Sequence, residues 1–290
     1  FSFLLLSVYF KFFKKLLSMP ELPEVEVVKN FLKSKFNEKR IQKIKIINKK
    51  LRYEIKSNLA KNFINLIITN IYRRGKYLIL MFENDSALLI HLGMTGYFRV
   101  LTKENLIKHD HIIFYFKSQL LIYNDIRKFG FIKFYKPKRV LTSPHLKKIG
   151  PEPLTKKYNF IYFKHHSKKV TNVKNLLMNQ KFVAGLGNIY CSEILFDAQI
   201  NPKKNCKDLK DVQIQKIITS TRKILKKAIK LGGTTIKNFI VSEEKIGYFK
   251  NELKVYGKEN FDCIRCLKLG IIKKIIQNGR STFYCSNCQK

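Results

Sequence analysis

Residues 20–28 read Pro-Glu-Leu-Pro-Glu-Val-Glu-Val-Val, and the apolar residues Phe31 and Leu32 follow shortly after. Prolines at the front, acidic residues in the first turn and apolar residues at helical spacing are typical of a helix N-terminus. We therefore expect a helix to begin at the front of this stretch.

A strand-like pattern follows from about residue 41 to residue 134. Short runs rich in β-branched and aromatic residues, such as residues 77–82 and 111–116, are broken by Gly, Asn and Asp. This spacing favours a β-sandwich or a barrel. We expect an N-terminal domain of this kind over residues 19–135 and a linker over residues 136–153.

The second half of the chain carries an apolar stripe at helical spacing, and Gly232-Gly233 supplies its stop signal. The stripe is formed by Leu209, Val212, Ile217, Ile218, Ile224, Leu225, Ala228 and Leu231. We expect most of it to lie in the core of a helical domain over residues 154–258. Together with the strands, this makes the expected fold class α+β.

Two Cys-x-x-Cys pairs lie near the C-terminus. They are Cys263-x-x-Cys266 and Cys285-x-x-Cys288, with residues 267–284 between them. This spacing is typical of a four-thiolate zinc site with two knuckles joined by a hairpin. Four thiolates close the tetrahedron, so we expect one structural Zn2+ that folds a hairpin too small to fold alone. An iron site or a redox pair is the alternative.

Between the cysteine pairs, Asn278-Gly279 favours a tight hairpin turn within the zinc finger expected over residues 259–290. The turn presents Arg280 at or near its tip, where an always-charged guanidinium suits phosphate recognition. The alternative is that Arg280 is one more solvated charge among the 58 basic residues.

The composition is strongly basic, with 58 Lys and Arg against 20 Asp and Glu and a formal net charge of +38. Repulsion among so many positive charges destabilises the folded chain unless a bound polyanion neutralises them, so nucleic acid is the first partner to consider. The alternative is genomic drift, because AT-rich coding enriches Lys, Ile, Asn and Phe. Part of the charge is then solvated surface.

Residues 1–18 are apolar and aromatic, do not begin with Met, and carry their lysines after the apolar run. A secretory signal places positive charge first and ends at a small-residue cleavage site, so the match is poor. The run of about ten apolar residues is also shorter than the roughly 20 that a membrane span needs. We interpret Met19 as the start of the working protein, and we expect no membrane partner and a cytoplasmic location.

Eight segments, in a fixed order, resemble the bacterial formamidopyrimidine-DNA glycosylase family. They are residues 19–26 (MPELPEVE), 74–78 (RGKYL), 91–96 (HLGMTG), 108–111 (KHDH), 186–190 (LGNIY), 232–235 (GGTT), 247–249 (GYF) and 282–285 (TFYC). The ordered set is highly specific and covers essentially residues 19–290. The resemblance implies a β-sandwich with flanking helices, a helix-two-turn-helix domain and a C-terminal zinc-finger hairpin, with DNA across the cleft between the halves.

The resemblance also implies an activity, the removal of oxidised purines (8-oxoguanine and formamidopyrimidines) that have been flipped out of duplex DNA. Pro20 would be the nucleophile once Met19 is removed, and the abasic site would be nicked by β,δ-elimination through a Schiff base. A free N-terminal amine titrates near about 7.7–8, so a usable neutral fraction exists at pH 7. A peptide bond to Pro20 leaves no such amine.

Four further side chains carry the implied chemistry. Glu21 would be the neighbouring general acid/base, and Glu24 would be a second carboxylate in the lesion pocket. Lys76 would contact phosphate and assist β-elimination, and Arg280 would serve the δ-elimination. Judged by residue type alone, Pro20, Glu21 and Glu24 are equally the proline and acids of an ordinary first helical turn.

DNA contacts follow from the same resemblance. An enzyme that reacts at the sugar must take the nucleotide out of the stack, so other side chains must fill the gap. The implied contacts are His109, Arg127, Lys169 and Asn188, with Met94, Arg127 and Phe129 as the intercalating set and Tyr248 in the loop that closes over the flipped base. The expected partner is damaged double-stranded DNA, bound by a monomer. Taken singly, Met94, Phe129 and His109 favour a core or structural role.

One segment departs from the family pattern, because Ile126-Arg127-Lys128 stands where Pro-Arg-Arg is common. The nearest rival is endonuclease VIII, a related glycosylase that prefers oxidised pyrimidines. Leu22 and the set of Met94, Arg127 and Phe129 favour the purine-specific type. The remaining alternatives are a non-catalytic zinc-ribbon nucleic-acid binder and a decayed repair enzyme that still binds damaged DNA.

Overall fold

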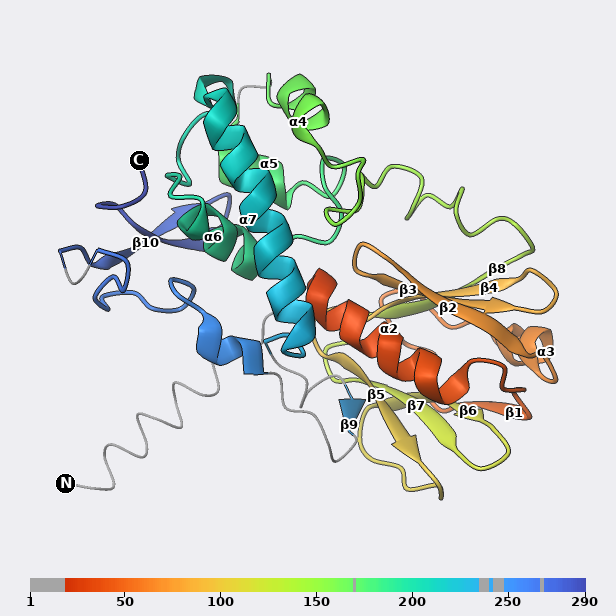
Figure 1. Ribbon diagram of the computed structural model, residues 1–290. Helices are drawn as coiled ribbons and strands as arrows, with labels where there is room; N and C mark the ends of the chain where they lie inside the picture. The colour runs from red at the N-terminus through yellow and green to blue at the C-terminus, as the bar shows by residue number, and fades with distance from the viewer. Residues whose placement is uncertain (1–18, 169–170, 235–239, 242–247, 267–268) are drawn as a thin grey trace, which may run out of the picture.

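The computed structural model describes residues 19–168, 171–234, 240–241, 248–266 and 269–290 (Figure 1). Within these residues the chain forms a β-sandwich and a helical half that carries a small hairpin, so the fold is α+β as expected. Figure 1 shows helix α2 running from the helical half along the sandwich. The leader considered above lies outside the described residues.

Helix α2 (Leu22–Phe36) confirms the predicted helix start. Glu21 is its N-cap, and the Glu21 main-chain N–H donates to the Glu24 carboxylate at 3.0 Å. This bond satisfies an amide at the start of the helix, as in a capping box. Pro23 fits the first turn because its missing N–H is not needed there.

The sandwich consists of two sheets. One has the strand order β1 (Lys43–Ile46), β6 (Asp110–Tyr115), β7 (Leu120–Asp125), β5 (Gly96–Leu101) and β9 (Ile240–Val241). The other has the order β2 (Ile68–Arg74), β3 (Tyr77–Phe82), β4 (Ala87–His91) and β8 (Phe131–Tyr135), and the short helix α3 (Leu59–Phe63) precedes β2. Neighbouring strands are antiparallel, except that β9 runs parallel to β5.

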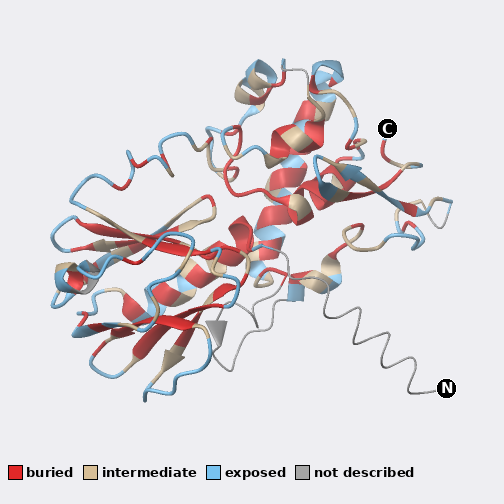
Figure 2. Ribbon diagram, turned by 180° about the vertical axis from the view of Figure 1, so that it is seen from behind, coloured by how far each residue is buried: buried red, intermediate tan, exposed pale blue. Residues whose placement is uncertain are grey.

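Helix α2 connects the two cores of the molecule. Inward-facing residues of both sheets, such as Leu80 and Ile112, form the sandwich core together with Val28 and Phe36 of α2. Leu22, at the start of the same helix, belongs instead to the core of the helical half. Figure 2 shows the buried segments between the sheets and through the middle of the helical half.

The helical half contains α4 (Phe160–His166), α5 (Val173–Met178), α6 (Asn188–Asp197) and α7 (Asp211–Lys230), with 3-10 turns η1 (Cys206–Asp208) and η2 (Tyr248–Glu252). Most of the predicted stripe is buried here. Val212 is an exception at 66% exposed. It lies two residues before the buried Ile214, which places it about 200° around the helix axis, so its assignment to the stripe was wrong.

The predicted hairpin consists of β10 (Ile272–Gln277) and β11 (Arg280–Cys285). Asn278 and Gly279 form its two-residue turn with φ of 47° and 70°, the positive values that a type I′ turn requires. Arg280 therefore begins β11 beside the turn, and it is exposed, as the sequence predicted.

The linker, residues 136–153, is packed against the sandwich. Val140 and Leu146 cluster with Ile79 and Leu89 of the four-stranded sheet. Because the other face of that sheet lies in the sandwich core, the linker covers its outer face.

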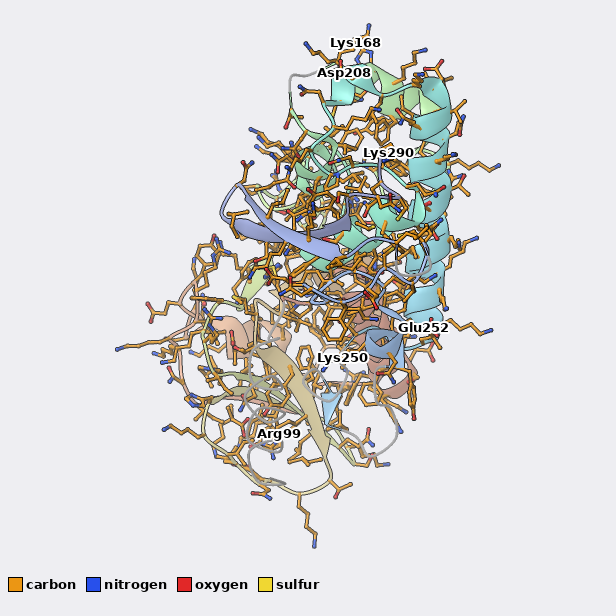
Figure 3. The ribbon with its side chains drawn as sticks, turned by 90° about the vertical axis from the view of Figure 1, so that its left-hand side faces the viewer. Arg99, Lys168, Asp208, Lys250, Glu252 and Lys290 are labelled. Carbon is orange, nitrogen blue, oxygen red and sulfur yellow. The ribbon has the colours of Figure 1, made fainter. Side chains whose placement is uncertain are left out.

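Charged side chains project from both halves of the molecule (Figure 3). Lys168 and Asp208 lie at the far end of the helical half, and Glu252 lies nearer the sandwich. Glu252 pairs with Lys227 at 2.6 Å. Among the described residues, no helix combines the length and the apolar character that crossing a membrane requires.

Because Leu22 is fully buried in the helical core, we expect Leu22→Ala to lower the free energy of unfolding by about 2–5 kcal/mol. The matched control is Val27→Ala, at a half-buried position of the same helix, with an expected loss of about 1 kcal/mol or less. Denaturant unfolding followed by circular dichroism measures both. Equal losses in the two variants would contradict the role assigned to Leu22.

Candidate active site

Glu21 lies between the two halves, against the N-terminus of α6. Its Oε1 accepts a hydrogen bond from the Ile189 amide at 2.9 Å, and its Oε2 accepts a longer one from the Tyr190 amide at 3.4 Å. These amides belong to the first helical turn, which leaves its N–H groups without intrahelical partners and carries the positive end of the helix dipole. Gly187, the N-cap, has no side chain to compete for them.

Burial raises the pKa of Glu21 to about 7, although the Lys76 ammonium opposes the shift and Glu24 adds to it. The two amide hydrogen bonds from α6 also favour the charged form. A carboxyl group with a pKa near 7 is present in both protonation states at neutral pH. It is therefore able to give or accept a proton in that range.

Gly187 leaves room for both Glu21 and Lys76. A Cβ atom at this position would lie 2.5 Å from Glu21 Oε1 and 2.7 Å from Lys76 Nζ. Both groups therefore occupy the bare side of the glycine, where a larger residue would displace one of them. The structure thus brings two residues predicted from sequence to one place, beside the buried Pro20.

The turn before Lys76 is held by the linker. Gly75 has a φ of +56°, which favours glycine, and its N–H donates to Glu152 Oε1 at 2.7 Å. Arg74 and Arg73 also contact the Glu152 carboxylate, at 2.9 and 2.7 Å. Sequence reasoning missed Glu152, because nothing local in the chain marks a carboxylate whose partners are so distant.

Glu24 is buried with both of its oxygens occupied. Its Oε1 accepts from the Tyr190 hydroxyl at 2.6 Å and from the Thr234 amide at 2.9 Å, while Oε2 accepts from the Glu21 amide. A Cβ at Gly233 would lie 2.7 Å from Glu24 Oε1, so a side chain at this position would displace the carboxylate. These contacts join α2, α6 and the end of α7, and the role of Glu24 in a lesion pocket stays a prediction.

Lys174 is a second residue that sequence reasoning missed. It is 1% exposed, and its Nζ donates to Asn188 Oδ1 and Thr282 Oγ1, both at 2.6 Å, and to the Ser281 carbonyl at 3.2 Å. Burial lowers its pKa to about 8. The lysine fastens the strand that carries Arg280 to α5 and α6. Among so many lysines, the sequence offers no signal that this one is buried.

The structure brings the predicted intercalating set together. Met94 is half-buried, Phe129 is 46% exposed, and the Arg127 guanidinium lies 4.7 Å from the centre of the Phe129 ring. These three residues line one cavity of about 580 Å³ with Met19 and His91. Burial lowers the pKa of His91 to about 3, so this imidazole is neutral.

Of the remaining residues predicted to contact DNA, the structure describes only some. His109 has a positive φ of 73°, and its carbonyl accepts from the Asp125 amide at 3.1 Å, close to the strand end that leads to Arg127. Tyr248 is 59% exposed at the start of η2. Lys169 and residues 242–247 of the predicted closing loop lie outside the described residues.

The four cysteine sulfurs lie within 4.8 Å of one another. The Cys263 and Cys288 sulfurs are 3.7 Å apart, and those of Cys266 and Cys285 are 3.8 Å apart. Sulfurs at about 2.3 Å from one tetrahedral Zn2+ would be separated by about 3.8 Å, so this arrangement fits such an ion. A Cβ at Gly270 would lie 2.9 Å from Cys285 Sγ, which explains a glycine beside the cluster.

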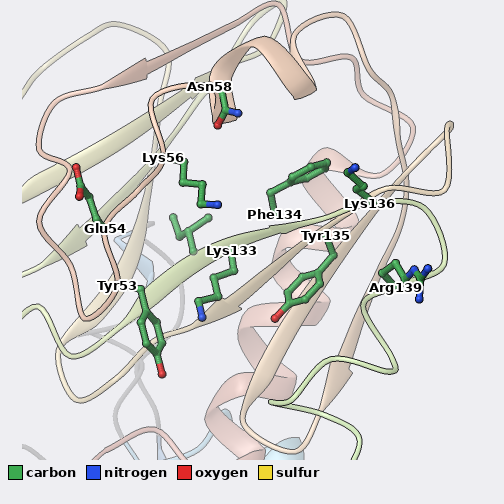
Figure 4. A pocket seen from close by; sticks show the side chains of 10 residues that line it. Tyr53, Glu54, Lys56, Asn58, Lys133, Phe134, Tyr135, Lys136 and Arg139 are labelled. Atoms are coloured by element: carbon green, nitrogen blue, oxygen red, sulfur yellow. The ribbon is translucent and has the colours of Figure 1, made fainter.

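A second cavity, of about 690 Å³, lies beside β8 (Figure 4). It is lined by Tyr53, Glu54, Lys56, Asn58, Ile132, Lys133, Phe134, Tyr135, Lys136 and Arg139. Lys133 and Tyr135 extend from β8, and the Lys133 ammonium lies 3.6 Å from the centre of the Tyr53 ring. The described site residues predicted from sequence do not line this cavity, so its size alone does not mark it as the active site.

Family models match two parts of the chain. Residues 19–132 match the formamidopyrimidine-DNA glycosylase N-terminal domain, and residues 149–240 match the formamidopyrimidine-DNA glycosylase H2TH domain. The chain is 42% identical to the formamidopyrimidine-DNA glycosylase of Rickettsia felis over 276 residues, which is 93% of this chain and 98% of the relative. It is 44% identical to that of Rickettsia canadensis, covering 93% and 99%.

Solved structures give the same result. A Lactococcus lactis FPG mutant in complex with DNA containing Fapy-dG superimposes with a TM-score of 0.86 at 38% identity, covering 93% of this chain and 100% of that one. MutM in complex with DNA containing carbocyclic 8-oxo-G has a TM-score of 0.85, with the same identity and coverage.

The raised pKa of Glu21 predicts a pH-dependent stability. The unfolded carboxyl has a pKa near 4.5 and the folded one about 7, so the folded state holds the proton more tightly. Below about pH 4.5 the group is neutral in both states, and as pH rises to about 7 burial of its charge destabilises the fold. Glu21→Gln should therefore gain stability relative to the parent chain over this window, by up to about 3 kcal/mol. Thermal unfolding of both chains between pH 4.5 and 8 measures the difference, and a pH-independent difference would contradict the raised pKa.

Proposed function

This chain belongs to the formamidopyrimidine-DNA glycosylase family of DNA-repair enzymes, and we propose that it flips oxidised purines out of duplex DNA, removes them and nicks the abasic site. The proposed substrates are 8-oxoguanine and formamidopyrimidines. The observation that carries the proposal is that Glu21 and Lys76 both lie against the bare side of Gly187, with Glu21 next to Pro20 in the chain. The similar proteins bound to Fapy-dG and 8-oxo-G DNA support the choice of substrate.

In the proposed reaction, Pro20 is the first residue of the working chain and its neutral secondary amine is the nucleophile. The amine nitrogen forms a bond to C1′ of the sugar, and the bond from C1′ to the damaged base breaks. The electron pair of that bond leaves with the base, which takes up a proton. The attached nitrogen loses its proton, its lone pair then breaks the bond from C1′ to the ring oxygen O4′, and O4′ takes up a proton. The iminium formed in this way at C1′ withdraws electrons from the sugar, and this assists the elimination of the 3′ and then the 5′ phosphate.

Glu21 is the proposed proton carrier for these steps. Its pKa near 7 suits a group that must give up and regain a proton at neutral pH. Lys76, on the same bare side of Gly187, is proposed to contact phosphate and assist β-elimination. Arg280 is proposed to assist δ-elimination, and its exposed position beside the hairpin turn is consistent with a phosphate contact.

Damaged double-stranded DNA is the proposed partner of a monomeric enzyme. Met94, Arg127 and Phe129 are proposed to fill the gap that the flipped nucleotide leaves, since they share one cavity and two of them are exposed. His109, Asn188 and Lys169 are proposed backbone contacts. Tyr248 and Glu24 are proposed to face the lesion.

One structural zinc ion is proposed at the four cysteines. Its ligands would be Cys263, Cys266, Cys285 and Cys288, and four thiolates leave no open position for a substrate. When bound, the ion supplies folding free energy and no reaction chemistry. Its proposed effect is to fix β10 and β11, and therefore Arg280.

Borohydride trapping tests the proposed reaction. Protein that begins at Pro20 is mixed with a duplex carrying one 8-oxoguanine and reduced with sodium borohydride. We expect a covalent protein–DNA adduct, visible as a shifted band on a denaturing gel, because the reductant converts the iminium to a stable amine.

The matched control keeps Met19, so that the two proteins differ by one residue and only one has a free proline amine. An adduct of equal yield with this control would exclude Pro20 as the nucleophile. No adduct and no strand cleavage by the protein that begins at Pro20, with DNA binding intact, would favour a non-catalytic binder.

The zinc proposal predicts that Cys285→Ser loses the bound metal and weakens duplex binding broadly, because the hairpin with Arg280 is no longer held. The control is Cys206→Ser, which alters a buried cysteine outside the cluster. Metal content by mass spectrometry and duplex affinity by fluorescence anisotropy measure the two effects. Unchanged affinity in a metal-free Cys285→Ser protein would overturn the assignment.

A further inference from the structure

Two loops at one end of the sandwich cross between the sheets in opposite directions. Residues 92–95 leave β4 of the four-stranded sheet and enter β5 of the five-stranded sheet, and they carry Met94. Residues 126–130 leave β7 and enter β8, and they carry Arg127 and Phe129. Since β4 pairs with β8 and β5 pairs with β7, the two loops lie side by side.

A single buried hydroxyl connects the two loops. Thr95 Oγ1 donates to Asp125 Oδ1 at 2.5 Å and accepts from the Arg127 amide at 3.0 Å. Thr95 is 7% exposed and Asp125 is fully buried. Loss of the hydroxyl therefore leaves the buried Asp125 carboxylate without this donor and the part-buried Arg127 amide without this acceptor.

Asp125 extends the connection beyond Thr95. Its other carboxylate oxygen, Oδ2, accepts from the Gly130 amide at 2.8 Å, at the far end of the loop that carries Arg127. Its own amide donates to the His109 carbonyl, and its carbonyl accepts from His111 Nε2 at 2.9 Å. One aspartate thus fixes both ends of one loop and the start of β6.

The backbones of the two loops also pack closely, with the Tyr123 hydroxyl against Gly130 and Gly96. Gly93 has a φ of +66°, and a Cβ there would collide with the Gly130 amide and the Phe129 carbonyl carbon. A Cβ at Gly130 would lie 2.7 Å from the His91 carbonyl oxygen. The loops are therefore in direct main-chain contact, and Thr95 sets how one lies relative to the other.

We infer that Thr95 and Asp125 are positioning residues that hold Met94, Arg127 and Phe129 as one rigid wedge for insertion into the duplex. This inference rests on the proposed function. Side chains that fill the place of a flipped nucleotide must remain inserted between the neighbouring bases, so that the nucleotide does not return. Insertion costs less conformational entropy when the loops that carry these side chains are already ordered. Neither Thr95 nor Asp125 needs to touch DNA for this role.

Thr95→Val tests the inference because valine keeps the shape of threonine and lacks the hydroxyl. In proteins that begin at Pro20, we compare two single-turnover rates, removal of 8-oxoguanine paired with cytosine and cleavage of a preformed abasic site. Base removal requires a paired base to be unstacked, whereas an abasic site has no base to unstack. We expect Thr95→Val to slow base removal by about tenfold, as loss of one buried hydrogen bond in the inserted state implies, and to slow abasic-site cleavage by less than about twofold.

Thr95→Ser is the matched control, since serine keeps the bridging oxygen, and both rates should stay within about twofold of the parent. Asp125→Asn is the second variant, because an amide cannot accept from both Thr95 and Gly130, and it should repeat the selective loss. Fluorescence of 2-aminopurine beside the lesion follows wedge insertion directly, and its rise should slow with base removal.

A merely structural role predicts a different result. If Thr95→Val and Asp125→Asn slow both rates by the same factor, or if neither slows base removal, the inference is wrong. The midpoint of thermal unfolding shows whether Thr95→Val or Asp125→Asn has lost its fold. If one of them has, the two rates of the other variant test the inference. The unmodified protein distinguishes failure of the proposed function from failure of this inference. If it does not remove 8-oxoguanine, the proposed function is wrong. If it is active and the variants are unaffected, only the positioning role of Thr95 and Asp125 is wrong.

Discussion

The arrangement of the candidate active site depends on one buried carboxylate at a helix N-terminus. Glu21 ends the extended start of the chain and caps α2, and its side chain accepts hydrogen bonds from the first amides of α6. Those amides belong to the helical half, whereas most of α2 packs into the sandwich core. The contact that joins the two halves therefore lies beside Pro20 and Lys76, and a shift between the halves would separate Glu21 from the amides of α6.

Opposing effects determine the pKa of the Glu21 carboxyl group. Burial disfavours its charge, while the amides of α6 and the Lys76 ammonium favour it, and the result is a pKa of about 7. Glu24 lies one turn away, and donors from Tyr190, Thr234 and Glu21 occupy both of its oxygens. Two neighbouring acids of one helix are thus suited to different tasks, one to proton transfer and the other to holding α2 against the helical half.

Local signals in the sequence predicted the parts of the fold that local forces determine. The proline and acids before α2, the Asn278-Gly279 turn and the four cysteines each act within a few residues or through a fixed ligand geometry, and each appears where it was expected. The contacts of Lys174, Glu152 and Thr95 could not be predicted in this way. Their partners are distant in the sequence and meet only after the sheets and helices have packed, so residue type alone does not distinguish them from solvated neighbours.

Five acidic residues of this basic chain are buried and bind main-chain amides. Glu21, Glu24, Asp110, Asp125 and Glu193 are each at most 3% exposed, and each accepts hydrogen bonds from main-chain amides. A buried acid of this kind fixes a loop or a helix end. Attraction of the basic surface for DNA phosphates does not depend on base sequence. Precision comes from the interior, where each carboxylate determines how a loop such as the one carrying Arg127 is presented to the DNA.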